Sequence, residues 1–156
     1  MYYEKIDLPI LSNLKLVYEL KKDLENKPEY VQEVQSVSLD SSKPHIGLKG
    51  NKGLYGSQQW WENINSGDIP IKFSYGVITR VYEAGQDHMG IVNSFDYETE
   101  TGLILTEGIY TLDSRDKKFF KKGHFVLIAY CLDELKSSDK EYIELVLEMA
   151  VSEKIL

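Results

Sequence analysis

The spacing of the hydrophobic residues changes near Ile69, from intervals of three and four residues to a strict alternation. The first spacing places apolar side chains on one face of a helix, and the second places them on one face of a strand. The pattern therefore predicts an α+β, mainly β fold, in which a helical part, residues 1–68, and a β-barrel, residues 69–156, form one compact unit. The alternation is clearest in 141–153, where the expected core residues are Ile143, Leu145, Leu147, Met149 and Val151.

Two helices are expected before the change in period. Apolar residues at helical spacing predict a helix from about residue 10 to residue 26, ended by Pro28, because a proline disfavours helical geometry in the residue before it. A short helix over about 57–66 has Ser57 as its N-cap and Gly67 at its C-terminus. The segment 30–39 is compatible with either a strand or a helical turn.

Five strands are expected after the change in hydrophobic spacing near Ile69. Gly76, inside the first of them, indicates a bulge or bend. Residues 98–102 read as a hairpin turn and 111–122 as a loop. The expected strands run over about 71–83, 89–97, 103–110, 124–132 and 141–153.

This arrangement resembles the OB-fold, a five-stranded, partly open barrel, over residues 70–153. An SH3-like barrel is the alternative. Separately, the segment Gly56-Ser57-Gln58-Gln59-Trp60-Trp61 resembles a pattern found in uncharacterised bacterial proteins, and this resemblance implies no function.

Charge and composition narrow the functional classes. The 156 residues carry a net charge of −7, which disfavours binding to nucleic acids without excluding it. The longest apolar run, 125–132, is far shorter than a membrane span. A single cysteine and an N-terminus unlike a secretory signal favour a soluble, cytoplasmic protein.

One group of residues could bind a single-stranded nucleic acid. In an OB-like barrel, aromatic residues of the second strand stack on bases, and lysines contact phosphates. The residues with these properties are Phe95, Tyr97, Lys118, Phe119 and Lys121.

A glycine-rich loop before the short helix offers an anion site. Free backbone N–H groups and the positive end of a helix can hold a phosphate, although the spacing is not that of a P-loop. The candidates are Lys49, Gly50, Lys52 and Gly53. They support a further alternative, an enzyme acting on a phosphate-containing small molecule.

No catalytic or metal-binding motif stands out, and no cofactor is expected. His45, His88 and His124 are far apart in the sequence, and Cys131 lies in the most apolar strand. We therefore expect a non-enzymatic module that binds another protein, with Trp60 or Trp61 as a contact residue. An acidic surface favours a basic partner, a toxin-neutralising or regulatory role suits these properties, and self-association through a strand edge is a further expectation.

Overall fold

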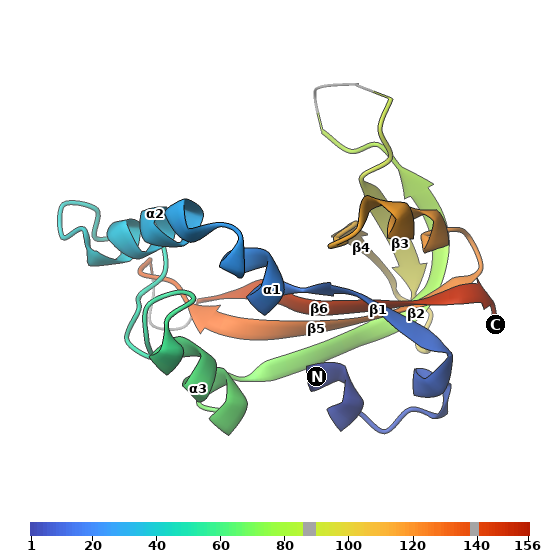
Figure 1. Ribbon diagram of the computed structural model, residues 1–156, viewed down its shortest axis with the longest axis horizontal. Coiled ribbons are helices and arrows are strands. Elements are labelled where there is room, and N and C mark those ends of the chain that lie inside the picture. Colours follow the sequence, from blue (N-terminus) through green and yellow to red (C-terminus); the bar gives the residue numbers. More distant parts are fainter. Residues whose placement is uncertain (86–89, 138–140) are drawn as a thin grey trace. The chain divides into compact units, whose positions relative to one another are not determined.

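The computed structural model describes residues 1–85, 90–137 and 141–156. Its main feature is a mainly antiparallel sheet with strand order β1-β6-β5-β2-β3-β4 (Figure 1). The strands are β1 (Leu14–Glu19), β2 (Ile71–Tyr82), β3 (Ser94–Glu98), β4 (Ile104–Gly108), β5 (His124–Glu134) and β6 (Tyr142–Ile155). The helices are α1 (Leu20–Glu25), α2 (Pro28–Leu39) and α3 (Gln58–Ser66), together with the 3-10 helices η1 (Tyr2–Lys5), η2 (Pro9–Asn13) and η3 (Ser114–Phe119).

The sheet is not the five-stranded barrel expected from the sequence. It has six strands in the described part of the chain, and β1 and β4 lie at its two ends, so it is not closed. The expected mainly β, antiparallel character is confirmed. The second expected strand begins at Met89, outside the described residues, and the corresponding strand β3 begins at Ser94.

The additional strand, β1, replaces the middle of the helix expected over 10–26. Residues Leu14 to Glu19 pair with β6, with Leu14 opposite Ser152 and Glu19 opposite Glu148. Residues 10–13 belong to the 3-10 helix η2, and only Leu20–Glu25 is α-helical, with Leu20 and Leu24 buried. The prediction was wrong because leucines, a valine and a tyrosine fit a strand as well as a helix, and pairing with β6 overrides helix propensity.

The ambiguous segment 30–39 belongs to helix α2. Pro28 occupies the first turn of this helix, where its missing N–H has no helical partner to lose. At the other end, the Lys136 ammonium group donates to the carbonyl oxygens of Val37, Asp40 and Lys43, at 2.5, 3.3 and 3.2 Å. These bonds add a charged donor to carbonyl oxygens at and just after the helix C-terminus, where a cation is favourable.

The chain forms two compact units, each assembled from separate segments. The first contains 1–19, 73–129 and 148–156, and the second contains 20–72 and 130–147. In the first unit, Ile78, Phe95 and Phe120 are buried; in the second, Trp60 and Ile64 are buried. The boundary expected near residue 68 stays a prediction about which segments fold together.

Strand β6 is covered on both faces in its central part. Leu147, Met149 and Val151 are buried as expected, whereas Ile143 is 38% exposed. The intervening Glu148 is also buried, and it accepts a hydrogen bond from the backbone N–H of Tyr2. Burial raises the pKa of the Glu148 carboxyl, because the charged form loses its hydration.

Candidate protein-binding site

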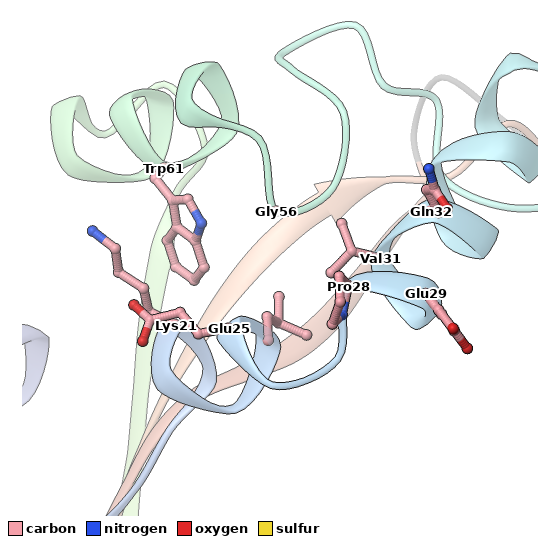
Figure 2. A pocket seen from close by; sticks show the side chains of 9 residues that line it. Lys21, Glu25, Pro28, Glu29, Val31, Gln32, Gly56 and Trp61 are labelled. Atoms are coloured by element: carbon pink, nitrogen blue, oxygen red, sulfur yellow. The ribbon is translucent and has the colours of Figure 1, made fainter.

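A cleft of about 600 Å³ opens beside Trp61 within the second unit (Figure 2). Helices α1 and α2 form one side, and the loop end at Gly56 and helix α3 form the other. Apolar groups and a charged or polar rim suit a pocket that receives side chains of a partner protein. We call this the Trp61 cleft; it is lined by Lys21, Leu24, Glu25, Pro28, Glu29, Val31, Gln32, Gly56 and Trp61.

Helix α3, which carries Trp61, is capped at both ends. The Ser57 hydroxyl accepts the Trp60 backbone N–H at 3.2 Å, which caps the N-terminus. Gly67 ends the helix in the left-handed conformation, with φ +88°, and its N–H donates to the Ile64 carbonyl. Both caps were expected from the sequence, and the helix they enclose is present at 58–66.

Trp60 anchors this helix in the core. Its ring is fully buried, and the indole Nε1–H donates to Asp133 Oδ2 at 3.0 Å. Successive helical residues point about 100° apart, so Trp61 faces another direction, with its ring at 72° to that of Trp60. Burial raises the pKa of Asp133, and the bond from Trp60 acts in the opposite direction.

Gly56 brings the loop close to the two helices that face α3. Its φ is +75°, and a Cβ at this position would lie 3.2 Å from Val31 and 3.6 Å from Leu24. A side chain would therefore have to push these two groups, which line the cleft, out of place. The glycine is explained by this close approach.

The rim of the cleft carries both signs of charge. The Lys21 ammonium lies 5.9 Å from the centre of the Trp61 ring, and Figure 2 shows Glu25 beside it on α1. Glu29 and Gln32 lie further along on α2. Helix α2 buries none of its residues, so its apolar side is only partly covered.

The comparisons with known proteins identify the family. A family model described as immunity protein RhsI2 matches residues 14–152. The chain belongs to the RhsI2 immunity protein family. A search of curated proteins gave no match. Within the described residues of this RhsI2-family protein, no helix has the length and apolar character needed to cross a bilayer. Its cytoplasmic location stays a prediction.

The glycine-rich loop of this family member uses its lysines in internal contacts. The Glu134 carboxylate lies 3.6 Å from the Lys49 ammonium and 3.7 Å from that of Lys52. Gly50 and Gly53 both have positive φ, and a Cβ on Gly53 would lie 2.5 Å from the Trp60 backbone nitrogen. These glycines therefore fit the loop around the start of α3. Anion binding by the loop stays a prediction.

The residues expected to bind a nucleic acid are divided between core and surface. Phe95 and Tyr97 are 0% and 2% exposed, and the Tyr97 hydroxyl shares a 2.6 Å hydrogen bond with Ser74. Both rings therefore pack in the core of the described structure, whereas stacking on a base needs an exposed ring face. Lys118 and Lys121 are exposed, with Phe119 partly buried, and their ligand-binding role stays a prediction.

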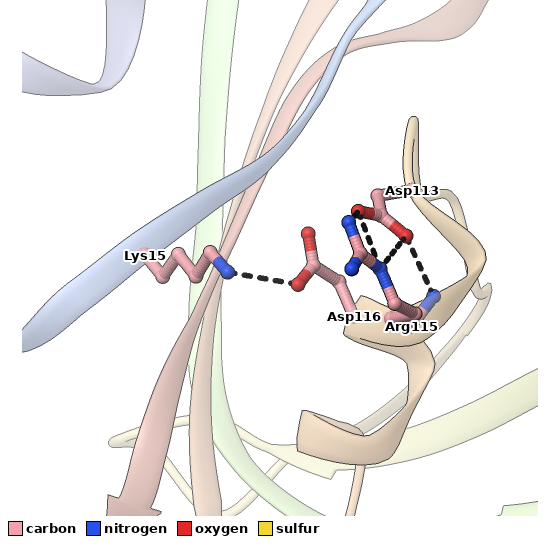
Figure 3. A network of polar contacts seen from close by, with 4 residues as sticks. All are labelled: Lys15, Asp113, Arg115 and Asp116. Atoms are coloured by element: carbon pink, nitrogen blue, oxygen red, sulfur yellow. Dashed lines mark hydrogen bonds and ion pairs between the residues drawn. The ribbon is translucent and has the colours of Figure 1, made fainter.

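Residues 115–122 contain one arginine and four lysines, and ion pairs hold the start of this basic segment (Figure 3). Lys15 on β1 contacts Asp116 at 2.8 Å, and Arg115 contacts Asp113 at 2.7 Å. The Arg115 guanidinium and backbone N–H lower the pKa of Asp113 to about 2. The segment expected as a loop here contains η3, with Asp113 as its N-cap.

The described histidines and the cysteine do not belong to a group of residues that could bind a metal ion. No group of three His, Cys, Asp or Glu residues in the described part of the chain could hold one. His124 is buried against the Ser152 carbonyl, with Nδ1 2.7 Å from that oxygen, and His88 lies outside the described residues. Burial raises the pKa of Cys131 to about 12, so its thiol is poorly suited to act as a nucleophile near neutral pH.

The sequence predicted Trp60 or Trp61 as a contact residue, but it did not indicate the residues of α1 and α2 that form the other side of the cleft. Lys21 and Glu25 were placed on one long helix, and the role of Val31 was left open. Pro28 was the available signal, because proline is common in the first turn of a helix as well as after its end. Two short helices separated at this proline create the side of the cleft that faces Trp61.

Proposed function

We propose that this protein protects the cell that makes it by binding a toxin directly, and that the Trp61 cleft contacts this toxin. The family match over residues 14–152 is the observation that carries the proposal. A protein that neutralises a toxin by binding it acts stoichiometrically and needs no catalytic centre. The proposal therefore commits to a non-enzymatic, protein-binding function.

The composition of the cleft supports its role as a contact. Trp61, which is 9% exposed, lines the cleft next to Leu24, Pro28 and Val31, and tryptophan is enriched among residues that dominate binding energy. Tyr30, between Glu29 and Val31 on α2, is 50% exposed. A partner that covers these groups would bury apolar area at the centre and leave charges at the rim.

The charge of the protein supports a basic toxin. A net charge of −7 accelerates encounters with a cationic partner and disfavours polyanions. Glu25 and Glu29 place two carboxylates at the rim of the cleft. We expect an arginine or lysine of the toxin to insert its carbon chain over Val31 and to place its charge near these acids.

A competition between two strains tests the function even while the toxin is unidentified. The gene is deleted in the strain that encodes it, and the deletion strain is grown in contact with wild-type cells. We expect the deletion strain to be killed, and a copy of the gene expressed from its own promoter to restore survival. Equal survival of the deletion strain and the wild type would refute the proposal.

Variants in the same assay test the cleft. Glu29→Lys reverses a rim charge at an exposed position, and Trp61→Ala removes the aromatic surface. Leu39→Ala is the matched control, because Leu39 is on the same helix, is 70% exposed and is not part of the cleft. We expect survival to fall for the first two variants and to be unchanged for the control. Full protection by Glu29→Lys and by a folded Trp61→Ala variant would exclude the cleft as the contact.

A further inference from the structure

Strand β4 lies at one end of the sheet, with β3 on its inner side. In the described residues, no strand pairs with its outer side. At the other end of the sheet, β1 has part of its outer side occupied, because the N–H of Leu112 donates to the Val17 carbonyl at 2.9 Å. The outer side of β4, residues Ile104–Gly108, is therefore a site where a further strand can be added; we call it the β4 edge.

The hydrogen bonds around the hairpin show which backbone groups face outward. Thr99 N–H donates to Leu103 O, and Ile109 N–H donates to Asn93 O, both at 2.9 Å. The pairing between β3 and β4 is regular between these bonds, and hydrogen-bonded pairs alternate along an antiparallel ladder. The alternation therefore directs residues 105 and 107 toward β3.

It follows that Ile104 and Thr106 direct their N–H and C=O groups away from β3. The N–H of Gly108, next in this series, donates to the Glu107 side chain at 2.8 Å rather than to β3, which agrees with this assignment. Two residues thus offer four main-chain groups to an added strand.

The β4 edge lacks several of the features that protect edge strands against pairing, although it is only five residues long and contains Glu107. Natural edge strands carry lysine, proline or a bulge that prevents association. Strand β4 has none of these, and its pairing with β3 is regular. Leu103 and Ile104, at its start, are 57% and 51% exposed. The edge therefore combines main-chain pairing groups with exposed apolar side chains.

The charge of the hairpin selects the kind of strand that fits. Residues 94–108 contain four acidic residues and no lysine or arginine, a net charge of −4. Asp96 is already engaged by Arg80, Tyr82 and Thr106, whereas Glu98 and Glu100 are exposed. A second copy of this chain would bring two such hairpins together, and their like charges would repel. A strand rich in lysine and arginine has the complementary charge.

We infer that an extended, basic segment of the toxin pairs with the β4 edge as an added strand. This inference rests on the proposed function, because the toxin supplies the segment. Main-chain bonds to Ile104 and Thr106 would give affinity, and the acidic hairpin would select cationic side chains.

A proline substitution tests the main-chain pairing. Thr106→Pro removes the outward N–H without removing a main-chain bond to β3, but it also removes the hydroxyl that donates to Asp96. Thr106→Ala is the control that loses the same hydroxyl but keeps the N–H. In the strain competition, with wild-type cells as the source of toxin, we expect Thr106→Ala to protect and Thr106→Pro to fail. The loss of one hydrogen bond and the steric obstruction of the strand correspond to about a tenfold or greater loss of affinity.

A charge reversal provides a second test that does not depend on the proline variant folding. Glu98→Lys combined with Glu100→Lys should reduce survival, whereas Glu4→Lys combined with Glu33→Lys makes the same change in net charge elsewhere and should not. Hydrogen exchange of the purified wild-type chain should show fast exchange at Ile104 and Thr106 and slower exchange at Leu105 and Glu107.

The outcomes separate this inference from the proposed function. If the wild-type gene fails to protect, the proposed function is wrong. If it protects and both Thr106→Pro and the Glu98/Glu100 variant protect equally well, the toxin is bound elsewhere and the β4 edge is excluded. If light scattering shows a dimer of the wild-type chain that Thr106→Pro converts to a monomer, a second copy occupies the edge and the inference is overturned.

Discussion

Replacing Trp60 by Phe should destabilise the protein by about 2–4 kcal/mol. The indole Nε1–H of Trp60 is the buried donor to Asp133 Oδ2, and hydrogen bonds to charged groups contribute about 1.5–3 kcal/mol. The smaller ring also leaves a gap in a fully buried position, which adds about 1 kcal/mol, a fraction of the cost of truncating an aromatic residue to alanine. For a chain of this length, the sum corresponds to a fall of about 5–15 °C in melting temperature.

Urea denaturation of four variants measures the two contributions separately. Trp61→Phe is the matched control, because it removes the same ring atoms from the neighbouring residue without removing the bond to Asp133. In an Asp133→Asn background the carboxylate charge is absent, so Trp60→Phe should cost less, by about 1 kcal/mol or more. Equal losses for Trp60→Phe and Trp61→Phe, with the same loss for Trp60→Phe in the Asp133→Asn background, would refute a stabilising bond between Trp60 and Asp133.

Four other substitutions test the sheet. Gly76→Ala should lower stability by about 1–3 kcal/mol in thermal melts, because its Cβ would lie 2.2 Å from the Glu98 carbonyl oxygen; Gly108→Ala, whose Cβ would come closest to a side chain, at 3.2 Å, should cost less. The pKa of Glu148 is raised above its ordinary value of 4.5 in the folded protein, so the wild type should lose stability as the pH rises above 4.5. Glu148→Gln should remove this loss, which urea titrations at several pH values would measure. Leu147→Asp should abolish the cooperative melting transition, and a normal melt would show that Leu147 is not in the core.

The elements with strong local signals were predictable from the sequence. Helix α3 has a capping residue at one end and a glycine at the other, and both act as expected. The hairpin turn, the strand that contains Gly76 and the last strand also lie close to their expected positions. Gly76 itself marks a close approach to Glu98, whereas the register shift in β2 lies between Ile78 and Arg80. Local chemistry sets these features, so one sequence is enough to find them.

Features that depend on distant pairing were not predictable. The segment 14–19 forms a strand because β6 offers it a partner, and no local pattern distinguishes this from an amphipathic helix. This strand makes the sixth member of the sheet and removes the basis for a five-stranded barrel. In the same way, the burial of Phe95 and Tyr97 follows from packing against Phe120 and from the bond to Ser74. Aromatic residues on a strand suit a core and a binding face equally well.

The site was predictable in its chemistry but not in its geometry. A tryptophan pair and an acidic composition suggested a protein partner, and the family match supports this class of function. The side of the cleft formed by α1 and α2 could not be found, because its position depends on the break between two short helices. The contacts of the loop lysines with Glu134 could not be found either, because Glu134 is more than 80 residues away in the sequence.

Binding and stability should be separable by substitution in this protein. Leu103, Ile104 and Tyr30 are each at least half exposed, so they contribute little to the core and can be replaced at small cost to the fold. Trp60 and Leu147 are buried, and their replacement must affect every function through unfolding. Loss of protection by a variant with a normal melting temperature therefore locates a contact with the toxin, whereas parallel loss of protection and stability does not. This distinction makes Ile104→Ala a sharper test of binding than any substitution in the core.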